Sequence, residues 1–178
     1  MRIGVMSDTH DRVPAIADLL QKFTNKGVSI VMHAGDYCSP FSLAPFHQRG
    51  MALLGVFGRN DGDRETLSAY AARGMGTEIY ESPHSFDVGG KRVLLVHDIG
   101  EVSARSVESH DYVLHGSSHL QSQKKVGNTL VINPGEACGW IHGKCTAAIL
   151  DTDSGEVENI SLGPAGSSSS ISAHNSRS

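Results

Sequence analysis

The segment RIGVMSDTHD, residues 2–11, decides how the rest of the sequence is interpreted. Its first five residues form a short apolar run, typical of a buried strand, which ends abruptly at a polar cluster containing Asp8 and His10. Residues 13–23 follow with the apolar spacing of a helix, and Pro14 suits the first turn of that helix. The opening of the chain therefore predicts a strand, a polar loop and a helix.

The same pattern continues further along the chain. Apolar strands are predicted at residues 28–32 and 51–57, with a short helix at residues 40–48 between them. The second strand ends in HAGD (33–36) and the third ends in GRNDG (58–62). Alternating strands and helices predict right-handed crossovers and a largely parallel sheet, in which ligands bind beyond the carboxyl ends of the strands. All three polar clusters lie at that edge.

The second half of the sequence predicts a mixed sheet with more hairpins. Helices are predicted at 63–73 and 101–109, and strands at 86–88, 92–96, 112–114, 129–132, 146–151 and 157–162. Gly-Gly at 89–90 and Thr-Asp-Ser-Gly at 152–155 supply hairpin turns. We expect one domain over residues 1–162, followed by a disordered Gly/Ser-rich tail over residues 163–178.

Composition excludes several classes of function. The 178 residues contain 15 Lys and Arg against 19 Asp and Glu, a net charge of -4, which argues against binding nucleic acid by bulk charge. No apolar run approaches the length of a membrane span, and no Walker-type or dinucleotide-binding glycine loop is present. Cys38, Cys138 and Cys145 form no CxxC pair, so a reduced, cytoplasmic setting is the simplest interpretation.

Carboxylate and histidine side chains follow separate predicted strands, where one site can assemble. Taken singly, each has an ordinary interpretation: Asp8 and Asp11 cap the following helix, and His97 and His119 are structural histidines. Taken together, the mixture of Asp and His favours Mn, Fe, Zn or Ni over Ca. A carboxylate between two cations can bridge them, and paired cations favour in-line displacement at phosphorus.

The order of these clusters resembles the calcineurin-like metallophosphoesterase superfamily, in particular its small prokaryotic phosphodiesterases. The matching blocks are Asp8-Thr9-His10, Gly35-Asp36, Gly58-x-Asn60-Asp61, His97, Gly116-x-x-His119 and Asn133-Pro134-Gly135. The resemblance covers Met1 to about Leu162 and implies an α/β fold, a four-layer α/β/β/α sandwich of two mixed sheets flanked by helices. It also implies a dinuclear metal site at the strand ends.

The resemblance also implies a role for each matching residue. Four residues match the ligands of the family's first metal, namely Asp8, His10, Asp36 and His119. Asp36 also matches the bridging carboxylate, and His97 matches a ligand of the second metal. We expect one firmly held divalent transition metal and at most a weak second ion, with Mn favoured and Ni, Fe or Zn as alternatives. Supporting residues are expected at His33, Asp98, Ser117, Asn133 and Gly135.

Two second-metal ligands of the family are replaced in this sequence. Arg59 stands where the family has Asn, and Ser117 stands where the family has His. A serine hydroxyl is a poor metal ligand, and a guanidinium group does not bind metal ions. Our hypothesis is that Arg59 takes the place of the second metal and holds a phosphate oxygen, with Asp98 orienting it. The alternative is that Arg59 points to solvent and Asn60 swings in as a substitute ligand. Asn60 also occupies the position of the family's general-acid histidine, so activated diesters should react better.

The resemblance thus implies a metal-dependent phosphodiesterase that hydrolyses a small or nucleotide-like phosphate ester by in-line attack of metal-activated water. Asp36, Arg59 and Asn60 are the candidate catalytic residues, and the last two are expected to contact the substrate phosphate. The alternative is a non-catalytic protein of this fold, either a scaffold like the small retromer subunit or a nucleotide-binding module. The complete first site favours the enzyme, because clustered buried carboxylates and histidines are costly without a cation. The sequence is compatible with an oligomer and indicates no membrane contact.

Overall fold

The computed structural model describes residues 1–163 and contains two mixed β-sheets. The first sheet has the strand order β11-β10-β1-β2-β3-β4. Its strands are β1 (Arg2–Met6), β2 (Ile30–His33), β3 (Ala52–Val56), β4 (Ile79–Tyr80), β10 (Thr146–Asp151) and β11 (Val157–Ser161). Strands β1 to β4 run parallel, whereas β10 and β11 are antiparallel to their neighbours. The tail predicted at 163–178 lies, from residue 164 on, outside the described residues.

The second sheet has the strand order β5-β6-β7-β9-β8. Its strands are β5 (His84–Val88), β6 (Lys91–Val96), β7 (Tyr112–His115), β8 (Gln121–Val126) and β9 (Thr129–Pro134). The three inner strands run parallel, and the two edge strands pair antiparallel with them. The predicted Gly-Gly hairpin at residues 89–90 joins β5 to β6.

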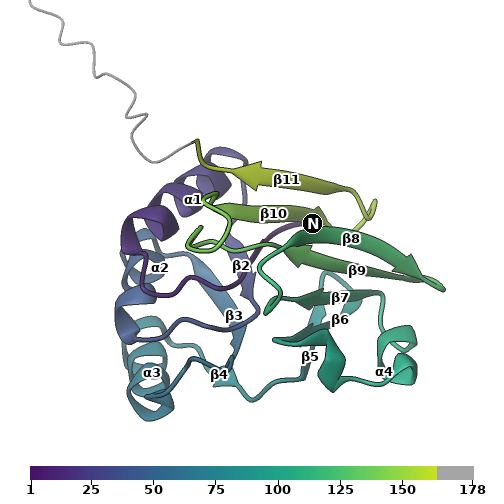
Figure 1. The fold of residues 1–178 in the computed structure, drawn as a ribbon, viewed down its shortest axis with the longest axis horizontal. Helices are drawn as coiled ribbons and strands as arrows, with labels where there is room; N and C mark the ends of the chain where they lie inside the picture. Colours follow the sequence, from purple (N-terminus) through teal and green to yellow (C-terminus); the bar gives the residue numbers. More distant parts are fainter. Residues whose placement is uncertain (164–178) are drawn as a thin grey trace, which may run out of the picture.

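Helices cover the outer faces of both sheets, so the predicted four-layer arrangement is confirmed (Figure 1). The helices are α1 (Val13–Asn25), α2 (Ala44–Arg49), α3 (Arg64–Tyr70) and α4 (Ala104–Glu108), with short helical turns η1 (Pro40–Ser42), η2 (Ala71–Met75) and η3 (Ile99–Glu101). The first three helices pack on the first sheet, and α4 packs on the second. Apolar side chains such as Val5, Met32, Leu95 and Leu114 fill the space between the sheets. No helix within residues 1–163 is both long and apolar enough to span a membrane.

The register of the first sheet aligns the ends of its parallel strands. Met6 of β1 pairs with His33 of β2, which in turn pairs with Gly55 of β3. Because these strands run in the same direction, the loops that follow them emerge side by side. The polar clusters that the sequence places after each strand therefore meet at one edge.

Several elements differ from the prediction. The helices predicted at 40–48, 63–73 and 101–109 are each broken into a shorter α-helix and a neighbouring 3-10 or π turn. Strands β4 and β8 were not predicted. Strand β4 has only two residues, and the residues of β8 are almost all exposed, so neither has an apolar pattern that marks a strand. Strand β8 forms because its backbone pairs with β9 at the sheet edge.

We expect Phe23→Ala to lower the free energy of unfolding by about 3–5 kcal/mol. The Phe23 side chain is fully buried, and its ring lies so close to β1 that only glycine fits at Gly4. The measurement is urea denaturation followed by circular dichroism. Lys22→Ala on the exposed side of α1 is the control and should change stability by less than about 0.5 kcal/mol. Equal effects of the two substitutions would contradict this account of the core.

Candidate metal centre

Backbone hydrogen bonds connect the loop after β1 to the loop after β2. The Asp8 amide donates to the Gly35 carbonyl at 3.0 Å, and the amides of Thr9 and His10 both donate to the Asp36 carbonyl at 3.1 Å. These bonds continue the parallel pairing past the strand ends and place Asp8, His10 and Asp36 together. Neither Asp8 nor Asp11 caps α1, because no side chain among the described residues caps its first turn, so the capping interpretation of these two residues is wrong.

The candidate first-metal residues share an unusual backbone conformation. All four lie in the left-handed region, with φ of 54° at Asp8, 39° at His10, 63° at Asp36 and 60° at His119. Left-handed residues other than glycine cost about 1–3 kcal/mol each and gather at functional sites. Asp and His tolerate this conformation better than most residues, so the residue types suit both the backbone and a ligand role.

The side chains from the two sheets converge on one cluster. His10 Nε2 lies 3.4 Å from Asp36 Oδ2, and His97 Nε2 lies 3.5 Å from the same oxygen. His119 Nε2 lies 3.4 Å from Asp8 Oδ1, which is 3.9 Å from His10 Nε2. Asp36 is thus in contact with histidines from both sheets.

In His97 and His119, a hydrogen bond from Nδ1 leaves Nε2 free to bind a cation. The Nδ1 of His97 donates to the Ala34 carbonyl at 2.7 Å, so its Nε2 carries the lone pair. The Nδ1 of His119 donates to Glu136 Oε2 at 2.9 Å, with the same result. This pairing of a ligand histidine with a carbonyl or carboxylate is typical of metal sites.

The donor atoms fit a divalent cation. Asp8 Oδ1 and His10 Nε2 are buried and have no hydrogen-bond partner within the described residues. Burial raises the pKa of Asp8, which disfavours its charged form unless a positive charge lies beside it. Asp8, Asp36 and His97 also form a group whose ligand atoms lie within 4.8 Å of one another. A cation would offset the burial of this cluster.

The two replaced positions, Arg59 and Ser117, and the neighbouring Asn60 lie next to the cluster. The guanidinium of Arg59 is paired with Asp98 and lies 3.9 Å from Glu101 Oε1; its side chain is 63% exposed. Asn60 lies inward, where its backbone amide and Nδ2 donate to the two oxygens of Asp36 at 2.8 and 2.7 Å. The Ser117 amide donates to Asp8 Oδ2 at 3.2 Å. Arg59 is thus paired with Asp98 and largely exposed, whereas Asn60 contacts the carboxylate expected to bridge; both alternatives for position 59 stay open.

The residues predicted to support the site hold its loops in place. His33 is fully buried: its Nδ1 accepts from the Gly35 amide at 3.1 Å, and its Nε2 donates to Thr9 Oγ1 at 3.2 Å. Burial lowers its pKa to about 3, so His33 stays neutral between these partners. Asn133 Nδ2 donates to the Gly116 carbonyl at 3.0 Å, and its Oδ1 accepts from the Gly135 amide at 2.8 Å.

Sequence reasoning missed Glu136, which is buried directly behind His119. Its carboxylate accepts from the amides of Ile141 (3.1 Å) and His142 (2.6 Å) as well as from His119. Burial alone would raise the pKa of Glu136, but the bonds from the His142 amide and His119 outweigh it and lower the pKa. Glu136 therefore remains an anion. Its place directly after the Asn-Pro-Gly block was the available signal.

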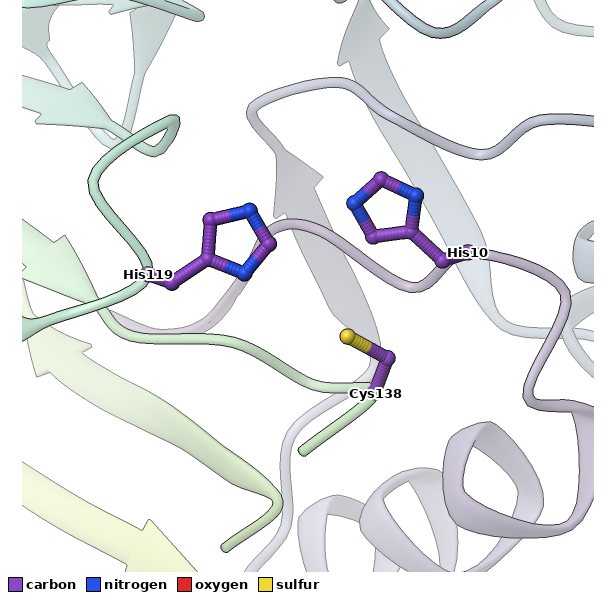
Figure 2. Close-up of side chains that lie close together, drawn as sticks. All are labelled: His10, His119 and Cys138. Atoms are coloured by element: carbon purple, nitrogen blue, oxygen red, sulfur yellow. The ribbon is translucent and has the colours of Figure 1, made fainter. Parts of the chain in front are cut away.

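Two further residues at the site were given no role by the sequence, although Asp61 belongs to one of the matching blocks. The carboxylate of Asp61 accepts from the amides of Asp36 (3.0 Å), Gly58 (2.7 Å) and Cys38 (2.8 Å), and so ties the second loop to the third. Cys138 lies beneath the gap between the rings of His10 and His119, with its sulfur pointing toward them (Figure 2). No CxxC spacing marks Cys138, so only the fold reveals its position.

Two facing sheets with a buried carboxylate–histidine cluster at their strand ends define a metal-binding hydrolase of the phosphoesterase type. Residues 1–155 match the family model described as the calcineurin-like phosphoesterase superfamily domain. The chain belongs to this family, as the sequence motifs indicated, and the family implies a divalent metal and a phosphate-ester substrate.

Sequence and structure comparisons with known proteins support this assignment. A phosphodiesterase of Methanocaldococcus jannaschii is 33% identical over 165 residues, which cover 91% of this chain and 99% of the relative. The structure of an archaeal phosphodiesterase, also 33% identical, matches with a TM-score of 0.85 over 91% of this chain and 100% of its own. Zinc-complexed Vps29 of Entamoeba histolytica is 17% identical, with a TM-score of 0.63 over 91% and 98% of the two chains, and shares the fold.

Proposed function

We propose that this chain is a metal-dependent phosphodiesterase. The observation that carries the proposal is the buried cluster in which Asp8 Oδ1 and His10 Nε2 lie 3.9 Å apart and have no hydrogen-bond partner among residues 1–163. The family supports hydrolysis of phosphate esters, and the 33% identical archaeal relative supports diesters in particular. The scaffold alternative is less favoured, because the likeness to Vps29 extends to the fold alone.

We assign a separate role to each residue of the cluster. Asp8, His10, Asp36 and His119 would hold the first cation, which lowers the pKa of bound water and neutralises phosphoryl charge. Asp36 and His97 remain for a second, weaker ion. Asn60 donates two hydrogen bonds to Asp36 and would face the substrate phosphate. Arg59, paired with Asp98, would bind a phosphate oxygen. Ser117 positions Asp8 through its amide.

The donor set favours Mn²⁺ as the native ion, with Ni²⁺, Fe²⁺ and Zn²⁺ as alternatives, because it mixes carboxylate with imidazole ligands. The substrate is a small phosphate diester of nucleotide-like size, since nothing in the net charge of -4 favours a polymeric nucleic acid. Three free cysteines, Cys38, Cys138 and Cys145, support a reducing, cytoplasmic setting.

The test is hydrolysis of an activated aryl phosphodiester with added Mn²⁺ or Ni²⁺, beside an EDTA-treated sample. We expect metal-dependent turnover that EDTA abolishes and that added metal restores. Because Asn60 stands where a general-acid histidine would lie, the rate should fall steeply as the leaving group becomes more basic. Absence of metal-dependent turnover with every phosphomonoester and diester tried would overturn the proposal and favour a binding protein.

We expect Arg59→Asn to raise the number of tightly bound ions from one to two per chain. The wild-type guanidinium lies beside Asp98, the neighbour of His97, and its permanent charge disfavours a second dication there. An amide oxygen at position 59 removes the charge and adds a ligand. The measurement is metal analysis of the dialysed protein, with exposed Arg92→Asn on β6 as the control. Two ions in the wild-type chain would contradict this role of Arg59.

A further inference from the structure

The loop between β9 and β10 carries an aromatic residue to the rim of the candidate metal centre. The loop starts at Glu136, which holds His119, and passes Cys138 beneath the two histidine rings (Figure 2). Two residues on, the indole Nε1 of Trp140 donates to the His10 carbonyl at 3.5 Å. Trp140 is therefore attached to the backbone of a candidate metal ligand.

Trp140 is held in position yet remains open to solvent. The Arg12 guanidinium lies 4.6 Å from the centroid of the ring and donates to the Cys138 carbonyl, so it links the ring to its own loop. The side chain of Trp140 is nevertheless 62% exposed. A ring positioned by a guanidinium and a hydrogen bond, with most of its surface free, can stack against a planar partner at low entropic cost.

Exposed apolar side chains occur on the segments that carry or position the candidate ligands. Within residues 1–163 the structure exposes five large apolar side chains, at Met1, Phe41, Leu120, Trp140 and Ile141. Leu120 directly follows His119, and the amide of Ile141 donates to Glu136. Three of the five thus come from segments that carry or position the candidate ligands. We call Leu120, Trp140 and Ile141 the apolar rim.

We propose that Trp140 is a specificity-determining residue, whose ring stacks on an aromatic group in the retained ester arm of the substrate. This inference rests on the proposed phosphodiesterase function and narrows its substrate class to diesters with a nucleobase or an aryl group in that arm. A metal centre recognises only the phosphate that all such esters share, so discrimination between arms must come from side chains at the rim. Leu120 and Ile141 add exposed apolar surface on the same two segments.

The first experiment compares three substrates that release the same p-nitrophenolate: bis(p-nitrophenyl) phosphate, thymidine 5′-(p-nitrophenyl) phosphate and ethyl p-nitrophenyl phosphate. Their retained arms are an aryl group, a nucleoside and an alkyl group. We expect Trp140→Ala to lower kcat/KM about ten-fold, or about 1.4 kcal/mol, for an ester with an aromatic retained arm and less than about two-fold for the ethyl ester. The loss should lie in KM, because stacking is present before and during the reaction.

Matched variants make this comparison specific. Trp140→Phe keeps a ring and should retain the preference within about three-fold. Phe41→Ala removes a ring that is 73% exposed on η1 and has no hydrogen bond to a candidate ligand, so it should leave all three rates unchanged. Whichever aromatic ester loses more in Trp140→Ala identifies a nucleobase or an aryl group as the preferred partner. Equal losses on all three esters, or none, would overturn the inference.

The second experiment needs no turnover. Trp140 is the only tryptophan of the 178 residues, so indole fluorescence reports on this ring alone. With Zn²⁺ present, titration with adenosine 5′-monophosphate should quench the emission, whereas ribose 5-phosphate should not. If no ester is hydrolysed but the nucleotide quenches, the proposed function fails, and Trp140 stands as a stacking residue for a nucleotide ligand without a role in substrate specificity. If the esters are hydrolysed and both ligands leave the emission unchanged, the function stands and the inference is overturned.

Discussion

Asp36→Asn is expected to lower kcat for an activated phosphodiester at least about a thousand-fold and to remove most bound metal. Asp36 is in contact with His10 at 3.4 Å and with His97 at 3.5 Å, so its carboxylate joins the donors of the two sheets. The negative charge of the Asp36 carboxylate offsets the charge of a bound dication. An Asn side chain lacks this charge but has nearly the same shape. Asn also accepts the left-handed φ of 63° that position 36 requires, which makes it a better test than Ala.

Two comparisons separate loss of the ligand from loss of the fold. Asp36 accepts hydrogen bonds from Asn60 Nδ2 and the Asn60 amide, and an Asn side chain at position 36 would turn one of these contacts into a donor–donor contact. Asp8→Asn provides a second variant, because Asp8 Oδ1 has no hydrogen-bond partner to lose in the part of the chain that the structure describes. The control is Asp87→Asn, an exposed carboxylate on β5. Metal content and rates that stay at wild-type levels in both site variants, with folding intact, would exclude these residues as ligands.

The position of the cluster could be predicted from the sequence, because parallel strands place their following loops at one edge of the sheet. A short apolar run that ends in polar residues predicts a buried strand followed by a loop, and loops after parallel strands share one edge. Asp8, His10 and Asp36 each follow such a run, and the structure brings them within 4 Å of one another or of a shared partner. His97 and His119 follow strands of the second sheet, and the prediction that they join this cluster rested on their strand-end positions together with the family resemblance.

Other features could not be predicted because they depend on long-range contacts. Strand β8 has the exposed, polar pattern of a loop and is a strand only through its pairing with β9. The Arg59 side chain lies near Asp98, an expected partner, and also near Glu101, which was not expected; both lie about forty residues away in sequence. The helix predicted at residues 63–73 contains no proline, yet it changes to a π turn after Tyr70. Local propensity does not encode these outcomes.

Glu136→Gln is expected to weaken metal binding about 10- to 100-fold, although the substituted residue is itself no ligand. The wild-type carboxylate accepts the Nδ1 proton of His119 at 2.9 Å, which leaves the lone pair on Nε2, 3.4 Å from Asp8 Oδ1. In the variant, the amide oxygen can still accept from the Ile141 and His142 amides, so its NH₂ group faces His119. The Nδ1 must then accept, and the proton moves to Nε2, where it blocks the cation.

The tautomer of His119 is the readout that distinguishes this mechanism from simple loosening of the loop. Nitrogen-15 NMR of the metal-free protein should show the proton on Nδ1 in the wild type and on Nε2 in Glu136→Gln, and calorimetry should show the matching loss of metal affinity. Glu78→Gln, an exposed position before β4, is the control for the loss of one negative charge. Because the variant alters one proton position behind a ligand, its unfolding midpoint should stay near that of the wild type. A variant that binds metal weakly while His119 keeps its proton on Nδ1 would show that Glu136 acts through the loop and not through the ring.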